Sequence, residues 1–379
     1  TDVSQLAGLT NLRVLDLYAL SGLEGLDPLA GMTDLEELYI GYTEVTDLEP
    51  LQGLTKMVRL DAPRNGLTDL SGLEGMTALE IVDLTDNELT DLSPLHQLTS
   101  LRLLRLSGNQ ISDLGPLAAL DHVYYLGLSV NQISDLSPLA SMAGLETVSM
   151  NYNRISDLGP VSGLPLLKDL SAGENRIVDL SLLLPAPALA YLDVWGNEIS
   201  DLSPLGEHAT LKRLGIEENL IGDLSPLASA PALEYITAGG QHFWPDDCLT
   251  GVWQPNPITL LDGSHPRLSP DQGALITVSD DFNWYRHEEN GTSGALWRTH
   301  GTMGDLDYQF GGYLGQTARP GQADPTPPPP TSPPPGGGNL ADSGAQPGAT
   351  QRGILAGVLL VLGVGCVVTR RYRNRCPVT

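Results

Sequence analysis

The sequence NQISDLSPLA at residues 131–140 returns in near copies along the chain: NQISDLGPLA at 109–118, NEISDLSPLG at 197–206 and NLIGDLSPLA at 219–228. The copies begin at multiples of 22 residues from one another, and each retains an asparagine, an aliphatic residue, Asp-Leu and Pro-Leu. A strand-like segment of the form L-x-x-L-x-L precedes each copy and starts, for example, at Leu101 and Leu189. The repeat part of the chain is therefore built from units of 22 residues, with one residue inserted between the unit at Leu12 and the unit at Leu35.

The full unit reads L-x-x-L-x-L-x-x-N-x-I-x-D-L-x-P-L-x-x-L-x-x, which is the pattern of a leucine-rich repeat. The apolar residues of L-x-L alternate with polar ones, as a half-buried strand requires. One unit cannot bury its own leucines, so neighbouring units must stack and share an apolar core. The spacing predicts an α/β-type solenoid of 22-residue coils over residues 1–241, with a parallel β-sheet on its concave face and short 3-10 helices or turns on its convex side.

Two polar positions recur together with the leucines. An asparagine side chain after each strand can hydrogen-bond backbone groups that would cost about 1–3 kcal/mol each if they were buried unpaired. We therefore predict a structural ladder of Asn65, Asn87, Asn109, Asn131, Asn153, Asn175, Asn197 and Asn219. The recurring aspartate, as at Asp113, either caps the helical turn that follows or contributes to a stack of carboxylates for calcium. The Asp-Leu-x-Pro context favours the cap, so we predict neither a metal site nor a cofactor.

The variable positions of the strand segments form the outward face of the predicted sheet. Eight of the twelve tyrosines lie there, among acidic residues such as Asp193 and Glu217, and the convex segments of the repeats carry none. Tyr, Trp and Arg concentrate binding energy at protein interfaces, although tyrosine also simply tolerates exposed strand positions. We predict a partner-binding surface on the concave face, formed by Tyr39, Tyr42, Arg64, Arg105, Tyr124, Tyr125, Tyr152, Tyr191, Trp195 and Tyr235. Its ligand is a protein or a glycan, because aromatic rings also suit sugars.

Composition excludes several functions. The formal net charge of −26 argues against nucleic acid as a partner, because phosphate binding needs clustered Lys and Arg. The three cysteines are scattered, so they predict neither a disulfide framework nor a zinc site. The histidines have no metal-ligand spacing, and those within the repeats, His96, His122 and His208, are predicted to be solvated surface residues. Without a catalytic motif, an enzyme is not expected.

The repeat period ends at residue 241, and a different organisation follows. Short β-type segments at 257–263, 274–280, 295–301 and 306–312 predict a small all-β domain at 242–318 that covers the last coil. Residues 319–339 are rich in Pro and Gly and predict an extended linker. The apolar segment 353–369 is a candidate membrane span, and the basic residues of 370–375 should remain cytoplasmic. The repeats are therefore expected to be extracellular.

The 22-residue unit resembles the repeats of internalins, the cell-surface proteins of Gram-positive bacteria, over residues 12–241. The resemblance implies that 242–318 is an immunoglobulin-like β domain, and that a cap or further repeats precede Thr1. The segment 340–379 is similar to a sortase sorting signal of an actinobacterial type, with Leu340, Ala341, Asp342, Ser343 and Gly344 as its pentapeptide and Ser343 in place of the usual Thr. By this resemblance, sortase and peptidoglycan are partners, and cleavage falls between Ser343 and Gly344. Without cleavage, segment 353–369 anchors the chain in the membrane.

These observations predict a non-catalytic binding protein that is anchored at the surface of a bacterium. Its concave face is expected to mediate protein–protein interaction or adhesion to another cell. The alternative is a glycan-binding or structural protein of the cell wall that has no host receptor.

Overall fold

The computed structural model describes residues 1–23, 25–243, 248–249, 254–270, 276–279, 281–287, 291–303 and 306–319. Four predicted features lie outside these residues: the linker beyond Arg319, the pentapeptide at 340–344, the apolar segment 353–369 and the basic segment 370–375. Within the described ranges, no apolar helix reaches the length that a bilayer requires.

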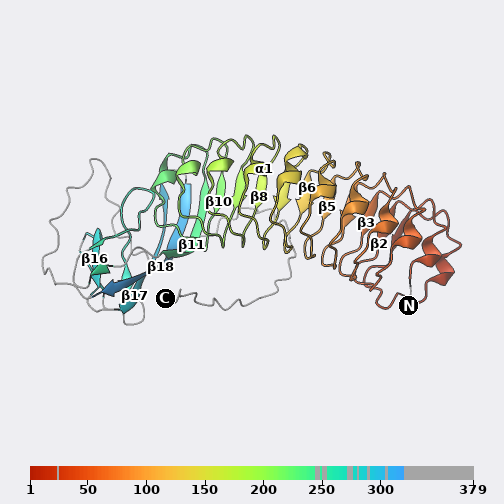
Figure 1. Ribbon diagram of the computed structural model, residues 1–379, viewed down its shortest axis with the longest axis horizontal. Coiled ribbons are helices and arrows are strands. Elements are labelled where there is room, and N and C mark those ends of the chain that lie inside the picture. Colours follow the sequence, from red (N-terminus) through yellow and green to blue (C-terminus); the bar gives the residue numbers. More distant parts are fainter. Residues whose placement is uncertain are drawn as a thin grey trace, which may run out of the picture. The chain divides into compact units, whose positions relative to one another are not determined.

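Short parallel strands from successive coils form one side of the repeat region (Figure 1). From β2 to β11 each strand pairs with the next in a register of 22 residues, so that Leu104 stands beside Leu126. The strands are β1 (Val14–Asp16), β2 (Glu37–Tyr39), β3 (Arg59–Asp61), β4 (Ile81–Asp83), β5 (Leu103–Arg105), β6 (Tyr125–Gly127), β7 (Thr147–Ser149), β8 (Asp169–Ser171), β9 (Tyr191–Asp193), β10 (Arg213–Gly215) and β11 (Tyr235–Phe243). The predicted parallel sheet of a leucine-rich-repeat solenoid is confirmed.

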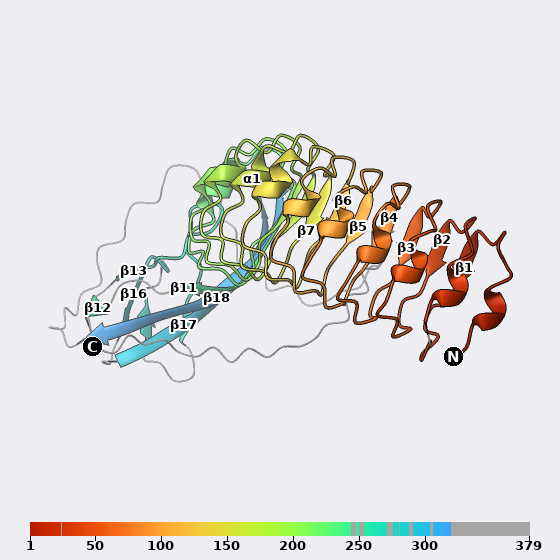
Figure 2. The same cartoon turned by 45° about the vertical axis from the view of Figure 1, so that its right-hand side comes forward.

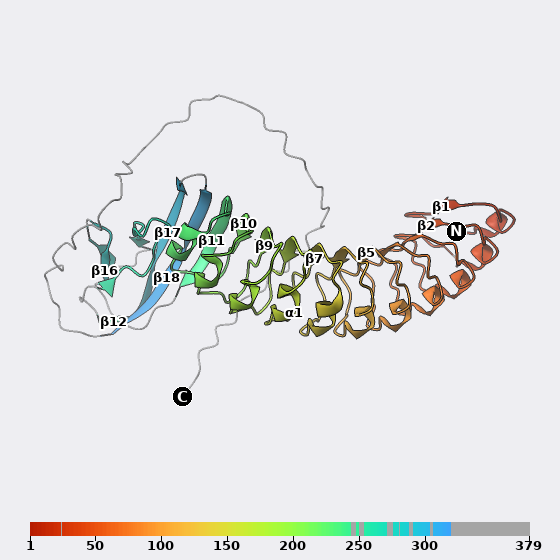
Figure 3. The same ribbon diagram turned by 90° about the horizontal axis from the view of Figure 1, so that it is seen from above.

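Single helical turns form the opposite side of the coils, and they follow the outer edge of the row in two further views (Figures 2 and 3). Most are 3-10 helices that contain the recurring proline. They are η1 (Ser4–Leu6), η2 (Asp27–Leu29), η3 (Glu49–Leu51), η4 (Ser71–Leu73), η5 (Ser93–Leu95), η6 (Gly115–Leu117), η7 (Ser137–Ser141), α1 (Gly159–Ser162), η8 (Ser181–Leu183), η9 (Ser203–Leu205) and η10 (Ser225–Ser229). The short 3-10 turns predicted for the convex side are therefore present.

The core lies between the strands and the helical turns. In the coil that starts at Leu101, every apolar position of the repeat is fully or almost fully buried: Leu101, Leu104, Leu106, Ile111, Leu114, Leu117 and Leu120. Burial of one such side chain contributes roughly 1.5–3 kcal/mol before chain entropy is subtracted. The stacking of coils therefore stabilises the solenoid along its whole length.

His208 departs from the prediction of a solvated histidine. It occupies the position that Leu98, Leu120 and Leu164 hold in earlier coils, and it is only 2% exposed. The prediction was wrong because the histidine replaces a core leucine of the repeat. Burial lowers the pKa of His208, which keeps the ring neutral.

The recurring aspartate hydrogen-bonds the first residue of the helical turn that follows it. Oδ1 of Asp91 accepts the Ser93 N–H at 2.8 Å, and Oδ1 of Asp157 accepts the Gly159 N–H at 2.7 Å. Each aspartate stands two residues before the first helical residue, one position earlier than a conventional N-cap. The Ser93 hydroxyl and then its N–H lower the pKa of Asp91. Across the described ranges, no group of His, Cys, Asp or Glu is arranged to hold a metal ion.

The asparagine after each strand connects two coils. Nδ2 of Asn109 donates to the carbonyl oxygens of Leu84 and Leu106, both at 3.0 Å, and its Oδ1 accepts the Leu89 N–H at 3.0 Å. In the last coil Gln241 takes this role, with Nε2 donating to the Ile216 carbonyl at 2.7 Å. From Asn65 onward, one side chain in each coil thus satisfies at least three backbone groups that are buried or partly buried.

The residue directly before this asparagine has a left-handed backbone. Its φ is 57° at Arg64, 58° at Val130 and 57° at Tyr152, and glycine occupies the same position at Gly108 and Gly196. This conformation is costly for a side chain with a Cβ, above all for β-branched valine. The repeat template did not reveal it, because the position is variable in sequence.

The β flank extends the same sheet. Its strands are β12 (Cys248–Leu249), β13 (Gln254–Pro255), β14 (Ser269–Pro270), β15 (Ile276–Val278), β16 (Trp284–His287), β17 (Gly291–Met303) and β18 (Leu306–Arg319). β18 pairs in parallel with β11 and β12, and antiparallel with β17, which pairs with β14. A small separate sheet has the order β13-β16-β15. The sheet is thus continuous across the predicted boundary at residue 241.

The strand expected at 257–263 is absent, apart from one isolated bridge between Asp223 and Thr259. Pro257 at the start of the segment has no N–H to donate, and Gly263 at its end, with φ of 78°, turns the chain. Ile258 and Leu261 are nevertheless buried, so the segment packs as an irregular cover.

Candidate binding surface on the concave face

The predicted surface residues lie on the strands, just after them or, for Tyr124, just before one, on the side opposite the helical turns. Tyr42, Tyr124, Tyr152, Tyr191 and Tyr235 are 39–50% exposed. Tyr39, Tyr125 and Trp195 are partly buried by neighbouring side chains. Apart from Tyr39, whose ring centre lies 5.1 Å from the Arg59 guanidinium, these residues and the two arginines form three clusters along the sheet instead of one patch.

The first cluster lies just after β1, β2 and β3. The Tyr18 and Tyr42 rings meet edge-to-face with their centroids 5.3 Å apart, and the Arg64 guanidinium lies 5.2 Å from the centre of the Tyr42 ring. Arg64 also pairs with Asp86 at 2.7 Å. These contacts hold the exposed side chains in fixed positions, so less side-chain conformational entropy is lost when a partner binds.

The second cluster lies over β5 and β6. The Arg105 guanidinium stands 5.5 Å from the centre of the Tyr125 ring and pairs with Asp83 at 3.3 Å. Tyr124, next in the chain, projects further into solvent. A partner would meet a cation and two aromatic rings at this point.

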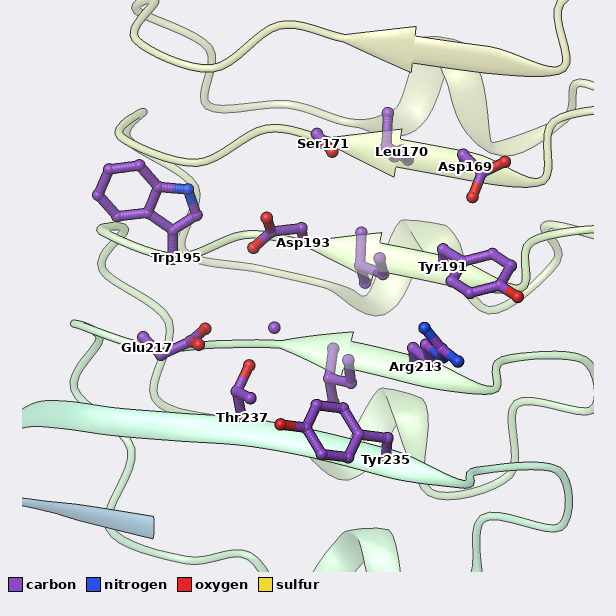
Figure 4. Close-up of a pocket in the computed structure, with 13 residues that line it drawn as sticks. Asp169, Leu170, Ser171, Tyr191, Asp193, Trp195, Arg213, Glu217, Tyr235 and Thr237 are labelled. Atoms are coloured by element: carbon purple, nitrogen blue, oxygen red, sulfur yellow. The ribbon is translucent and has the colours of Figure 1, made fainter. Parts of the chain in front are cut away.

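The third cluster surrounds a hollow of about 540 Å³ over β8 to β11. Tyr191, Trp195 and Tyr235 line it, and the Trp195 ring meets Tyr152 edge-to-face at 5.5 Å. Figure 4 shows the carboxylates of Asp193 and Glu217 on the Trp195 side of the hollow, with Arg213 beside Tyr191. The Arg213 guanidinium lies 5.4 Å from the centre of that ring. The third cluster thus combines aromatic rings, carboxylates and one cation around a single space.

Two carboxylates of the hollow have altered acidity. Burial, followed by repulsion from Glu217, raises the pKa of Asp193 to about 6, although the Trp195 N–H partly offsets this. Burial also raises the pKa of Asp169. Both carboxylates are thus partly removed from water, and nearby donors and cations do not fully replace the lost hydration.

Two glycines create the space that these side chains occupy. A Cβ at Gly215 would lie 2.6 Å from Oδ1 of Asp193, and one at Gly173 would lie 2.2 Å from Nε1 of Trp195. Both approaches are too close for any other residue without rearrangement. Gly215 thus leaves the floor of the hollow open, and Gly173 allows the Trp195 ring to fold over the neighbouring coil.

The sequence pattern identified Tyr191, Trp195 and Tyr235 but missed Arg213, Asp169 and the two glycines. The strand pattern was analysed within each repeat, whereas the hollow depends on residues of different repeats that lie side by side. On consecutive strands these are Asp169, Tyr191, Arg213 and Tyr235. These four residues are 22 positions apart in the sequence, so a comparison of every 22nd residue groups them from the sequence alone.

The family model described as "Leucine Rich repeats (2 copies)" matches residues 77–119 and 99–141. No curated protein matches the chain. Among solved structures, the chain is similar to the crystal structure of an internalin (inlF) from Listeria monocytogenes. The two share 32% identity over 64% of this chain and 72% of that one, with a TM-score of 0.60.

Two further structures show the range of the similarity. An internalin C2 (inlC2) from Listeria monocytogenes is 32% identical over 50% of this chain and 83% of that one, with a TM-score of 0.48. The ectodomain of the Arabidopsis thaliana receptor kinase GASSHO1/SCHENGEN3, solved in complex with CASPARIAN STRIP INTEGRITY FACTOR 2, is 19% identical. It covers 65% of this chain and 35% of its own, with a TM-score of 0.50, and so shares the fold.

Proposed function

Because the chain belongs to the internalin-like leucine-rich-repeat proteins, we propose that it is a non-catalytic extracellular protein that binds a protein partner on its concave face. The observation that carries this proposal is the set of exposed rings and guanidinium groups on strands of fixed register. Tyrosine, tryptophan and arginine contribute most to protein interfaces, and their mutual packing here reduces the entropy lost on binding.

We further propose that the protein acts at the surface of a Gram-positive bacterium, as an adhesin toward another cell. The support is the sequence beyond the described residues: Leu340–Gly344, the apolar segment 353–369 and the basic segment 370–375. If sortase accepts Ser343, the chain becomes covalently attached to peptidoglycan. If it does not, the apolar segment holds the chain in the membrane.

One experiment tests both parts. The full chain is displayed on a sortase-bearing Gram-positive bacterium, and cell-wall and membrane fractions are probed for it. Adherence to cultured animal cells and to other bacteria is then compared for the parent chain, for Tyr124→Ala/Tyr125→Ala/Tyr191→Ala/Trp195→Ala, and for a matched control. The control is Leu182→Ala/Leu184→Ala, which truncates two side chains on the convex side that are 48% and 51% exposed.

The four-residue variant should reduce adherence at least about tenfold, because each lost interface anchor typically costs more than about 1 kcal/mol. The control should adhere like the parent. Circular dichroism must show that both variants remain folded. Equal adherence of all three chains would refute a role for the concave face, and recovery of the chain only in membranes would refute attachment to the wall.

The alternative function is glycan binding. The observation that favours it is the hollow between Tyr191, Trp195 and Tyr235, since sugar rings stack on aromatic side chains. A carbohydrate array separates the two functions, because a glycan-binding protein gives signals that free sugar competes away. A purely structural wall protein would give neither array signals nor adherence.

A further inference from the structure

Two carboxylates of the hollow over β8 to β11 lack the cation that many carboxylates along the sheet have. Seven carboxylates on or beside the strands pair with a cation: Glu36 with Arg13, Asp61 with Arg59, Asp86 with Arg64, Glu80 with Arg102, Asp83 with Arg105, Glu146 with Lys168, and Glu234 with Lys212. Asp193 and Glu217 make no such pair with any lysine or arginine that the structure describes. They are adjacent, and each repels the other's negative charge.

The partly buried carboxylates therefore leave a local excess of negative charge in the hollow. Asp169, Asp193 and Glu217 line the hollow, whereas among the described residues Arg213 is its one lining cation. Arg213 lies over the Tyr191 ring, at the end of the hollow away from Glu217 (Figure 4). A ligand with a positive charge beside Asp193 and Glu217 would therefore be attracted to both carboxylates and would offset their mutual repulsion.

The aromatic side chains around these carboxylates suit the same kind of group. The faces of Trp and Tyr rings attract ammonium and guanidinium groups, by about 0.5–2 kcal/mol depending on how far the cation is desolvated. Trp195 stands beside the two carboxylates, and Tyr235 lies across the hollow from it. A long basic side chain would place its methylene groups against the rings and its charge against the carboxylates.

We propose that this hollow binds a lysine or arginine side chain of a basic segment in the partner protein, with Asp193 and Glu217 pairing with its charge and Trp195 and Tyr235 enclosing its stem. The inference rests on the proposed function, since it names the chemistry that the concave face recognises. A neutral sugar could stack on the same rings, but it would leave the two carboxylates without a counter-charge.

Binding of such a side chain depends on pH. Asp193 must be ionised, and its raised pKa of about 6 places the loss of that charge in mildly acidic solution. Affinity should therefore fall as the pH drops from 7.5 to 5. The other titratable or charged groups that face the hollow are Asp169 of β8, Tyr191 of β9, Arg213 of β10, Glu217 after β10 and Tyr235 of β11.

The test records fluorine NMR spectra of the full chain, in which 5-fluorotryptophan replaces all five tryptophans. The variant Trp195→Phe assigns the resonance of Trp195. The probes are a capped hexalysine peptide, a capped hexaglutamate peptide and a neutral hexasaccharide of N-acetylglucosamine, titrated at physiological salt. Asp193→Asn/Glu217→Gln removes both charges with little change in shape. Glu88→Gln/Glu198→Gln removes two exposed charges outside the hollow and serves as the matched control.

Hexalysine should shift the Trp195 resonance, and hexaglutamate should not. Its dissociation constant should rise about tenfold or more in Asp193→Asn/Glu217→Gln but less than about twofold in Glu88→Gln/Glu198→Gln. Equal weakening in both variants would mean that only the net charge attracts the peptide, which overturns the proposal. A Trp195 shift with the hexasaccharide alone would also overturn it. Either failure leaves the adherence experiment unaffected, so the two conclusions can fail separately.

Discussion

His208 shows how one residue can depart from the repeat without breaking the fold. Both ring nitrogens lie in the core without a hydrogen-bond partner of good geometry among the described residues, although the Leu183 carbonyl partly offsets the fall in pKa. Ala186 and Ala230 hold the equivalent positions in the coils on either side, which leaves room for the larger ring. A buried polar group of this kind lowers stability by about 1–3 kcal/mol.

We therefore expect His208→Leu to raise the free energy of unfolding by about 1–2 kcal/mol at neutral pH. The gain should be larger at pH 5, because the unfolded histidine binds a proton below its ordinary pKa of 6.5, whereas burial lowers the pKa of the folded ring and so disfavours its protonation. Urea unfolding at pH 5 and pH 8 measures both values. His122→Leu is the exposed control, and an equal effect there would show that burial is not the cause.

At the scale of the element, each coil turns sharply after its strand through a left-handed residue. Val130 is the least suited occupant, because its branched Cβ opposes a φ of 58° and its side chain is 54% exposed. Val178 is also 54% exposed but is not among the residues with positive φ. The two valines thus differ in backbone conformation and not in exposure.

Val130→Gly should accordingly stabilise the protein by about 0.5–1 kcal/mol, because relief of the strained backbone exceeds the entropy that glycine adds to the unfolded chain. Val178→Gly should destabilise it by about the same amount, since only the entropic term acts there. Thermal unfolding of both variants tests this pair. A loss of stability in both would show that the turn carries no strain.

The same comparison shows what the repeat pattern can and cannot reveal about an element. The strands, the helical turns and the asparagine positions follow from a periodic arrangement of leucines, and the hydrogen bonds of Asn109 agree with that interpretation. The left-handed turn does not follow, because a backbone angle leaves no mark at a position where Tyr, Arg, Asp and Val all occur. The prediction of a strand at 257–263 was wrong although its central residues favour a strand, because Pro257 and Gly263 at its two ends do not.

At the scale of the whole molecule, the last coil does not end in an exposed edge. β18, which is about 70 residues further along the chain than β11, pairs with it through Ile236 and Tyr308. The Thr259 carbonyl also accepts the Leu224 N–H at 3.0 Å. Pairing over such a separation is not encoded in any local pattern, so the sequence predicted a β flank without predicting how it joins the sheet.

A chain cut after Phe243 should therefore lose protection near the cut and not elsewhere, because each coil of a solenoid contacts only its neighbours. Amide hydrogen exchange should accelerate at least about tenfold in β10 and β11 and remain unchanged in β5 to β7. Mass-spectrometric exchange on the full and shortened chains measures this. Unchanged exchange in β11 would show that β18 contributes nothing to its stability.

The sequence predicted which residues face outward on the candidate surface, but it did not predict the hollow. The tyrosines, Trp195 and the arginines could be placed outward from the alternation of the strands alone. The hollow could not, because it results from absent side chains at Gly173 and Gly215 and from contacts across four strands.

The constant 22-residue register has a consequence for how such a surface changes over generations. Recombination between near-identical stretches of the gene would insert or delete one whole coil, and the neighbours would close up around it. The first cluster and the hollow would then move apart or together by one strand spacing, about 4.8 Å, while the chemistry of each stayed intact. The distance between the two sites can therefore change only in steps of one strand spacing, and such steps would fit the protein to partners whose contact points are differently spaced.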